Sequence, residues 1–132
     1  LDLPYQVYNQ ANVVAELPGN GSTDEVIIVL GHYDTTFTGA LDNNGGVATI
    51  LGLAKYFARK PRESRNRDMI FAFLFGHDTL GNLGHKVFVE QHKDLMNKAI
   101  TVDVDHPVTG PKYVYDETQG KFVPVDEMPE RL

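Results

Sequence analysis

Two short apolar runs constrain the fold of this chain more than any other feature. Residues 25–30 (EVIIVL) and 69–75 (MIFAFLF) are continuous and rich in β-branched or aromatic side chains, which is typical of strands buried on both faces. Between them, apolar residues recur at mostly helical spacing from 44 to 59, and Pro61 ends the run. A strand, a helix and a second strand in this order indicate an α/β fold with a mostly parallel central sheet.

Weaker patterns complete the expected order of elements. Residues 12–17 alternate and stop at the turn sequence PGNG, which predicts a hairpin with the strand at 25–30. Residues 83–91 predict a second helix and residues 99–104 a third strand. Residues 112–115 and 121–123 predict a C-terminal hairpin, followed by a loosely held tail from Pro124.

Length and composition favour one globular unit. The chain has 132 residues, of which 42% are hydrophobic, so residues 1–132 are expected to form a single domain with its own core. No apolar run approaches the ~18 residues that span a bilayer, and no membrane span is expected. Because 18 acidic residues outnumber 12 basic ones, the net charge of −6 would repel a phosphate backbone, and no nucleic acid partner is expected.

Polar side chains follow each of the three expected parallel strands. His32 and Asp34 follow the first strand, Asp78 follows the second, and Asp105 ends the third. In an open parallel sheet, ligands bind beyond the carboxyl ends of the strands, so these side chains are expected to share one site. The chain has no cysteine, so a metal ion there would be held by histidine and carboxylate groups.

A histidine with two carboxylates is a suitable ligand set for a divalent metal. Residues 32 and 34 lie on the same side of an extended chain, so Asp34 is expected to accept a hydrogen bond from the His32 imidazole while the other ring nitrogen binds metal. Asp42, in the loop before the helix, and Asp105 can reach the same point. Asp103 points to the same side as Asp105 and is the alternative to it.

Each of these residues also has an ordinary structural interpretation. A single histidine at a strand end is usually a surface residue or a hydrogen-bonded polar one. The stretch DNNG at 42–45 is typical of a turn with a helix N-cap, and DHP at 105–107 is typical of a turn. His85 and His92 fall on the second helix and are expected to be solvated or structural, outside the site.

Several motifs in a fixed order give the chain a specific resemblance. Residues 12–19 (NVVAELPG), 31–34 (GHYD) and 39–43 (GALDN) are followed by 71–76 (FAFLFG), 80–84 (LGNLG) and 88–90 (FVE). Over residues 12–106 the chain resembles the zinc aminopeptidase family, that is, aminopeptidase Y-type and glutamate carboxypeptidase-like metallopeptidases. The resemblance implies a three-layer α/β sandwich, truncated here at its C-terminus, in which residues 107–132 form a hairpin and tail.

The resemblance implies a role for each site residue. It implies that His32 and Asp105 hold a zinc ion, that Asp42 bridges to a second zinc, and that the peptide bond between Asp42 and Asn43 is cis. Asp78 takes the position of the family's general base. Asp34 supports His32.

The chain departs from the family at the second zinc. The family has a Glu-Glu pair whose second member binds that zinc, whereas the pair here reads Asp78-Thr79, and a neutral hydroxyl is a poor zinc ligand. The family's last ligand, a later histidine, has no counterpart after His106. One zinc ion is therefore expected. His77 is an alternative ligand, although neighbouring residues at a strand end usually point apart.

Two functions follow from the resemblance. The first is a metal-dependent hydrolase of peptides, of the aminopeptidase type, with Asp78 as general base for a zinc-activated water. The second is a non-catalytic binding or scaffolding domain, which Thr79 and the absent histidine favour. The resemblance alone favours a secreted or periplasmic location. It also implies a bare sheet edge, covered by self-association, by a further part of the protein or by the C-terminal hairpin.

Overall fold

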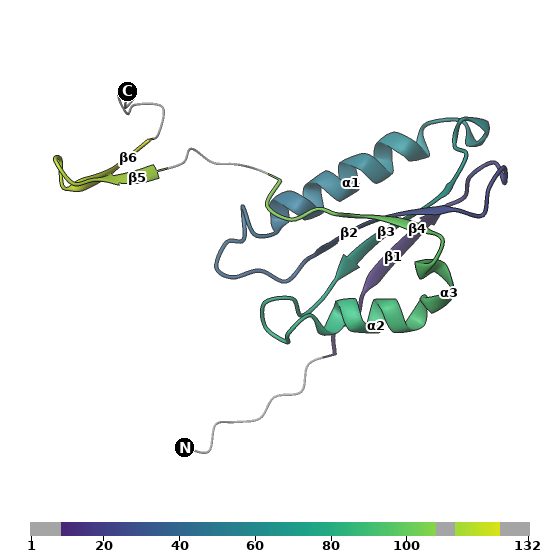
Figure 1. Ribbon diagram of the computed structural model, residues 1–132, viewed down its shortest axis with the longest axis horizontal. Coiled ribbons are helices and arrows are strands. Elements are labelled where there is room, and N and C mark those ends of the chain that lie inside the picture. The colour runs from purple at the N-terminus through teal and green to yellow at the C-terminus, as the bar shows by residue number, and fades with distance from the viewer. Residues whose placement is uncertain (1–8, 108–112, 125–132) are drawn as a thin grey trace, which may run out of the picture.

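A four-stranded sheet forms the centre of the computed structural model, which describes residues 9–107 and 113–124 (Figure 1). The strands lie in the order β1-β3-β2-β4. Their bounds are β1 (Val13–Leu17), β2 (Val26–His32), β3 (Asp68–Leu74) and β4 (Ala99–Asp103). Strand β2 pairs in parallel with both β3 and β4, and β1 runs antiparallel to β3 at an edge of the sheet. The sheet is thus mostly parallel, as the two buried strands predict.

Helices cover both faces of this sheet. They are α1 (Asn44–Ala58), α2 (Leu83–Gln91) and α3 (Lys93–Met96), with a short 3₁₀ turn η1 (Arg62–Ser64) before β3. Figure 1 shows α1 on one face and α2 with α3 on the other. The predicted helices at 44–59 and 83–91 are confirmed, whereas α3 has too short an apolar pattern to be predicted.

The alternation of side chains along β2 divides the core into two clusters. On one face, Ile28 and Leu30 pack with Phe88 of α2, and Leu95 and Met96 of α3 lie against the same cluster. On the other face, Val29 and Phe71 pack with Ile50 of α1. Burial on both faces explains why β2 and β3 have continuous apolar sequences rather than alternating ones.

The predicted hairpin between residues 12–17 and 25–30 is wrong. Strand β1 pairs with β3, from Val13 opposite Phe73 to Leu17 opposite Met69, and β2 lies on the far side of β3. Four of the five β1 residues are exposed, so this strand suits an edge, whereas the apolar β2 needs a neighbour on each side. The connection from 18 to 25 is long enough to pass the end of β3, where the Gly19 amide donates to the Asp68 carboxylate.

The predicted C-terminal hairpin forms a sheet of its own. Strands β5 (Tyr113–Asp116) and β6 (Lys121–Pro124) pair with each other, and neither pairs with β4. Within the described ranges no strand pairs with the outer edge of β4, where Ile100 and Val102 are 55% and 46% exposed. The hairpin therefore does not cover this edge. The tail expected at 125–132 lies outside the described residues.

No helix in the described part of the chain has the length and apolar character needed to cross a membrane.

Helix α2 approaches β3 through a glycine. The Gly84 amide donates to the carbonyl of Phe75 at 2.9 Å, and a Cβ at position 84 would lie 2.3 Å from that oxygen and 2.7 Å from Oδ1 of Asn12. Both contacts are with groups held by hydrogen bonds, because the Asn12 side chain bonds to the backbone of Phe75 and Gly84. Only glycine fits this contact without a shift of α2.

We expect Gly84→Ala to lower the free energy of unfolding by roughly 1–3 kcal/mol, because the added methyl group overpacks the contact between α2 and β3. Gly52→Ala is the matched control, since Gly52 is also helical and has open space around its Cβ position. The control should stabilise the protein by ~0.5–1 kcal/mol through helix propensity. Urea unfolding followed by circular dichroism measures both changes. Equal effects of the two substitutions would contradict this packing.

Candidate metal centre

The carboxyl ends of β2 and β4 and the start of α1 are joined by one buried side chain. Asn43 is 0% exposed, and its amide donates to the carbonyls of Val104 at 2.9 Å and His32 at 3.3 Å. Its side-chain oxygen accepts from the Gly46 amide, which caps the N-terminus of α1. The peptide bond between Asp42 and Asn43 is cis, which confirms the expectation. Asn43 thus fixes the three segments that carry the predicted metal ligands.

The predicted ligands His32, Asp42 and Asp105 converge at this point. His32 is the last residue of β2, and its Nε2 lies 3.0 Å from Oδ1 of Asp42 and 3.6 Å from Oδ1 of Asp105. In the register of β2 and β4, Leu30 lies opposite Asp103, so continuing by two residues brings Asp105 beside His32. Asp103 lies opposite Leu30, two positions before His32, and so does not lie beside the histidine. The structure therefore brings Asp105, and not its alternative, to the histidine.

Two atoms of this set are buried without a hydrogen-bond partner in the described residues. They are Nε2 of His32, whose side chain is 3% exposed, and Oδ1 of Asp42. They face each other, but their geometry is not that of a hydrogen bond. Burying such groups unpaired costs free energy, and a cation that both can ligate removes the cost. One imidazole nitrogen and two carboxylates form a ligand set that zinc accepts, so the residues fit this metal.

Asp34 supports His32 differently from the prediction. Nδ1 of His32 lies 2.9 Å from the backbone carbonyl oxygen of Asp34, and the carboxylate oxygen Oδ1 is further away at 3.5 Å. Because a carbonyl can only accept, Nδ1 carries the proton and Nε2 keeps its lone pair. The expected orientation of the ring is thus obtained, but from the backbone of Asp34 rather than from its carboxylate.

The carboxylate of Asp34 instead holds the segment after β3. It accepts from the backbone amides of His77 at 3.0 Å and Asp78 at 3.1 Å. Burial alone raises the pKa of Asp34, but these two hydrogen bonds favour the ionised form and hold its pKa below its usual range. The ionised carboxylate therefore positions Asp78, one of whose carboxylate oxygens lies with His32 and Asp42 in a group whose ligand atoms are all within 4.8 Å of one another.

His77 and His85 lie beside the site. The His77 ring stacks on His32, with centroids 4.3 Å apart and planes 20° from parallel, and the His85 ring lies 5.6 Å from His77. Burial lowers the pKa of His85 against the opposing effect of Asp103. His85 is thus closer to the site than expected, since its helix begins directly after the loop that carries Asp78. His92 bonds to Phe88 and lies outside the site, as expected.

His106 is a site residue that the sequence analysis treated only as part of a turn. Its Nε2 lies 3.3 Å from Oδ2 of Asp42, and its Nδ1 lies 3.1 Å from Oδ1 of Asp105. The available signal was its place directly after Asp105, at the end of the third parallel strand. By contrast, Thr79 is exposed and supplies no metal-binding group.

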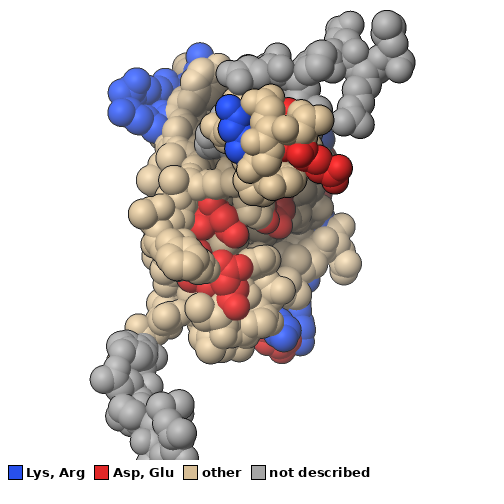
Figure 2. Space-filling model, turned by 90° about the vertical axis from the view of Figure 1, so that its left-hand side faces the viewer, with Lys and Arg blue, Asp and Glu red and all other residues tan. Residues whose placement is uncertain are grey.

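Acidic side chains gather at the end of the molecule that holds His32, Asp42 and Asp105. Strands β2 and β3 end on the left of Figure 1, and that side faces the viewer in Figure 2. Figure 2 shows acidic side chains gathered around a hollow near the middle of this face, while Lys and Arg lie towards its margins. A concentration of negative charge at one hollow attracts cations to it.

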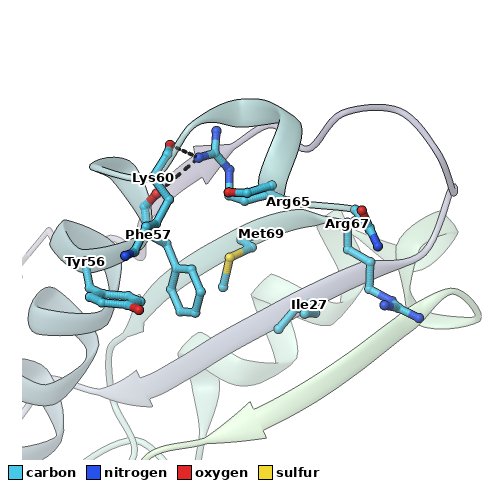
Figure 3. A pocket seen from close by; sticks show the side chains of 9 residues that line it. Ile27, Tyr56, Phe57, Lys60, Arg65, Arg67 and Met69 are labelled. Atoms are coloured by element: carbon cyan, nitrogen blue, oxygen red, sulfur yellow. Dashed lines mark hydrogen bonds between the residues drawn. The ribbon is translucent and has the colours of Figure 1, made fainter.

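A pocket lies away from this site, beside the opposite ends of the strands (Figure 3). It has a volume of about 410 Å³ and is lined by the apolar side chains of Ile27, Phe57 and Met69 together with basic residues. Arg65 bonds to backbone carbonyls, including those of Phe57 and Lys60, and Arg67 pairs with Glu25. Its two guanidinium groups are thus bound to protein groups, and none of the predicted site residues lines it.

Comparison with known proteins finds peptidases among the proteins similar to this chain. The chain is 26% identical to a probable glutamate carboxypeptidase of Arabidopsis thaliana over 77% of its own length, and 42% identical to a probable zinc metalloprotease of Pyricularia oryzae over 39%. It is 29% identical to a vacuolar membrane protease of Candida glabrata over 61% of its length. It spans only 15%, 12% and 8% of these three relatives, respectively.

A solved structure and a family model both indicate a peptidase of family M28. The crystal structure of a peptidase M28 precursor from Shewanella amazonensis matches 71% of this chain with a TM-score of 0.63 and 30% sequence identity, and 22% of that protein is covered. The model of peptidase family M28 matches residues 12–122. The chain therefore belongs to peptidase family M28.

Proposed function

We propose that this chain carries the metal centre of a zinc-dependent peptide hydrolase of the aminopeptidase type. The observation that carries the proposal is the pair of buried, unpartnered atoms, Nε2 of His32 and Oδ1 of Asp42, with Asp105 beside them. Membership of family M28 and the similarity to a probable zinc metalloprotease support zinc as the ion. Zinc, when bound, lowers the pKa of a water molecule and polarises a peptide carbonyl.

The residues of the chain supply the remaining steps. His32 binds through Nε2, because its Nδ1 proton is committed to the carbonyl of Asp34. Asp78 accepts the proton of the attacking water and later returns it to the leaving amine, the usual sequence for a carboxylate base. The carboxylate of Asp34 holds the backbone of Asp78 in place through its two hydrogen bonds.

We propose that the described sheet is part of a three-layer sandwich of the zinc-exopeptidase type, and that residues 1–132 belong to one domain of it. The helices on both faces of the sheet and the likeness to the Shewanella amazonensis protein support this. The free edge of β4 is where further strands of such a sheet would pair. A secreted, periplasmic or vacuolar location suits a peptidase of this kind.

The alternative function is that of a non-catalytic binding or scaffolding domain. One observation favours it: the position of the family's second glutamate holds Thr79, an exposed neutral residue. A scaffold does not need the metal ion, whereas the hydrolase does. Zinc binding and hydrolysis therefore distinguish the two functions.

We expect Asp42→Asn to weaken zinc binding at least about tenfold, because a neutral amide oxygen is a much poorer ligand than a carboxylate. Zinc retained after dialysis against a chelator of known affinity measures the change. Asp94→Asn removes the same charge from an exposed residue of α3 and should leave retention unchanged. Equal retention by the two variants would remove Asp42 from the ligand set.

We expect Asp78→Asn to lower kcat for hydrolysis of aminoacyl amides about 10²-fold or more, because the general base is lost. Zinc retention should be unchanged, since Asp78 is not among the three proposed ligands. Asp78→Glu keeps the carboxylate and should retain most of the activity. Absence of hydrolysis in the zinc-loaded original protein would favour the scaffold instead.

We expect Asp34→Asn to lower the free energy of unfolding at pH 7 by about 1–3 kcal/mol, because the amide cannot accept from both backbone N–H groups. The native pKa of Asp34 is lowered, so its stabilising effect is complete above the ordinary pKa of about 3.9. The effect is lost as the pH falls through the lowered pKa. The difference between the two proteins in urea unfolding should therefore shrink at acid pH. A constant difference from pH 7 to pH 2 would contradict this role.

A further inference from the structure

His106 and His32 each face one oxygen of the Asp42 carboxylate. The carboxylate of Asp42 lies between the two imidazoles: its Oδ1 faces Nε2 of His32 at 3.0 Å, and its Oδ2 faces Nε2 of His106 at 3.3 Å. The two histidines come from different strand ends, β2 and β4. The His106 side chain is 49% exposed and that of His32 is 3% exposed, so His106 lies on the solvent side of Asp42.

Each ring places its Nε2 near one carboxylate oxygen of Asp42 and its Nδ1 near another oxygen atom. Nδ1 of His32 lies 2.9 Å from a carbonyl oxygen, and Nδ1 of His106 lies 3.1 Å from Oδ1 of Asp105. The hydrogen bond to the carbonyl of Asp34 fixes the tautomer of His32 and leaves its lone pair on Nε2. In the Nδ1-protonated tautomer, Nε2 of His106 carries a lone pair as well. In both rings this lone pair then faces a carboxylate oxygen of Asp42. Two such acceptors at this separation repel each other unless a cation lies between them.

We propose that His106 is a metal ligand of this centre and binds through Nε2. The inference rests on the proposed metal-binding function, and it adds a second imidazole from a residue that lies three positions after the end of β4. Asp42, Asp105 and His106 offer ligand atoms that lie within 4.8 Å of one another, which is the spacing that a shared ion requires.

A different role for His106 predicts the opposite result. If its ring were protonated on both nitrogens, His106 would be a cation that pairs with Asp42 and Asp105 and competes with zinc for them. Removing such a competitor would leave zinc affinity unchanged or raise it. Removing a ligand lowers it, so the sign of the change separates the two roles.

The test compares zinc affinity of the whole chain with that of His106→Gln, by competition with a chromophoric chelator at pH 7.5. We expect affinity to fall at least about tenfold for His106→Gln. His92→Gln is the control, because His92 lies on the far end of α2, bonded to Phe88, and affinity should not change. An unchanged or higher affinity of His106→Gln overturns the proposal.

A second measurement does not depend on how well the variant folds. Long-range ¹H–¹⁵N spectra of the original protein report each imidazole nitrogen, and zinc should move the Nε2 resonances of both His32 and His106 while the His92 ring stays unaltered. A His106 ring that keeps its metal-free spectrum at saturating zinc overturns the inference and leaves the proposed function intact. If the original chain binds no zinc, the inference and the proposed function fall together.

Discussion

The buried amide of Asn43 is the interaction on which the rest of the site depends. Asn43 is fully buried, and its three side-chain hydrogen bonds join the end of β2, the end of β4 and the first turn of α1. Gly46 makes this possible, because a Cβ there would lie 2.1 Å from the Asn43 side-chain oxygen. An apolar residue at position 43 would leave two backbone carbonyls and one amide unpaired in the interior, each at a cost of about 1–3 kcal/mol.

Much of this arrangement could be predicted from the sequence because it follows from local patterns. Continuous apolar runs mark strands buried on both faces, and parallel strands bring their carboxyl ends to one edge of a sheet. Those two facts place His32 and either Asp103 or Asp105 at one edge, and Asp42 reaches them from the loop before the helix. The strand register explains why Asp105 rather than Asp103 reaches His32. The roles of these residues as metal ligands, and of Asp78 as base, remain predictions.

The features that sequence reasoning did not reach are set by contacts between distant segments. The partner of β1 depends on which strand can accept an exposed edge neighbour, and a turn sequence such as PGNG does not record that choice. Asp34 was assigned to the His32 ring, yet its carboxylate bonds to the backbone of a loop 43 residues away. The sequence places His106 in a turn, because only the fold shows that its Nε2 lies 3.3 Å from Oδ2 of Asp42.

Strand β4 is an edge strand of the main sheet: within the described residues it pairs on one side only, and four of its five residues are exposed. Asp105, two positions after the end of that strand, belongs to the proposed zinc ligand set, and we propose that His106 belongs to it as well. Ligand binding to the native state alone adds RT ln(1 + [L]/Kd) to its stability, about 2.7 kcal/mol at a hundredfold excess over Kd. Because that free energy is gained only when β4 is paired with β2, zinc binding would stabilise the pairing of this edge strand. Amide hydrogen exchange in β4 reports the local opening of this strand. Its rate would then fall as the zinc concentration rises.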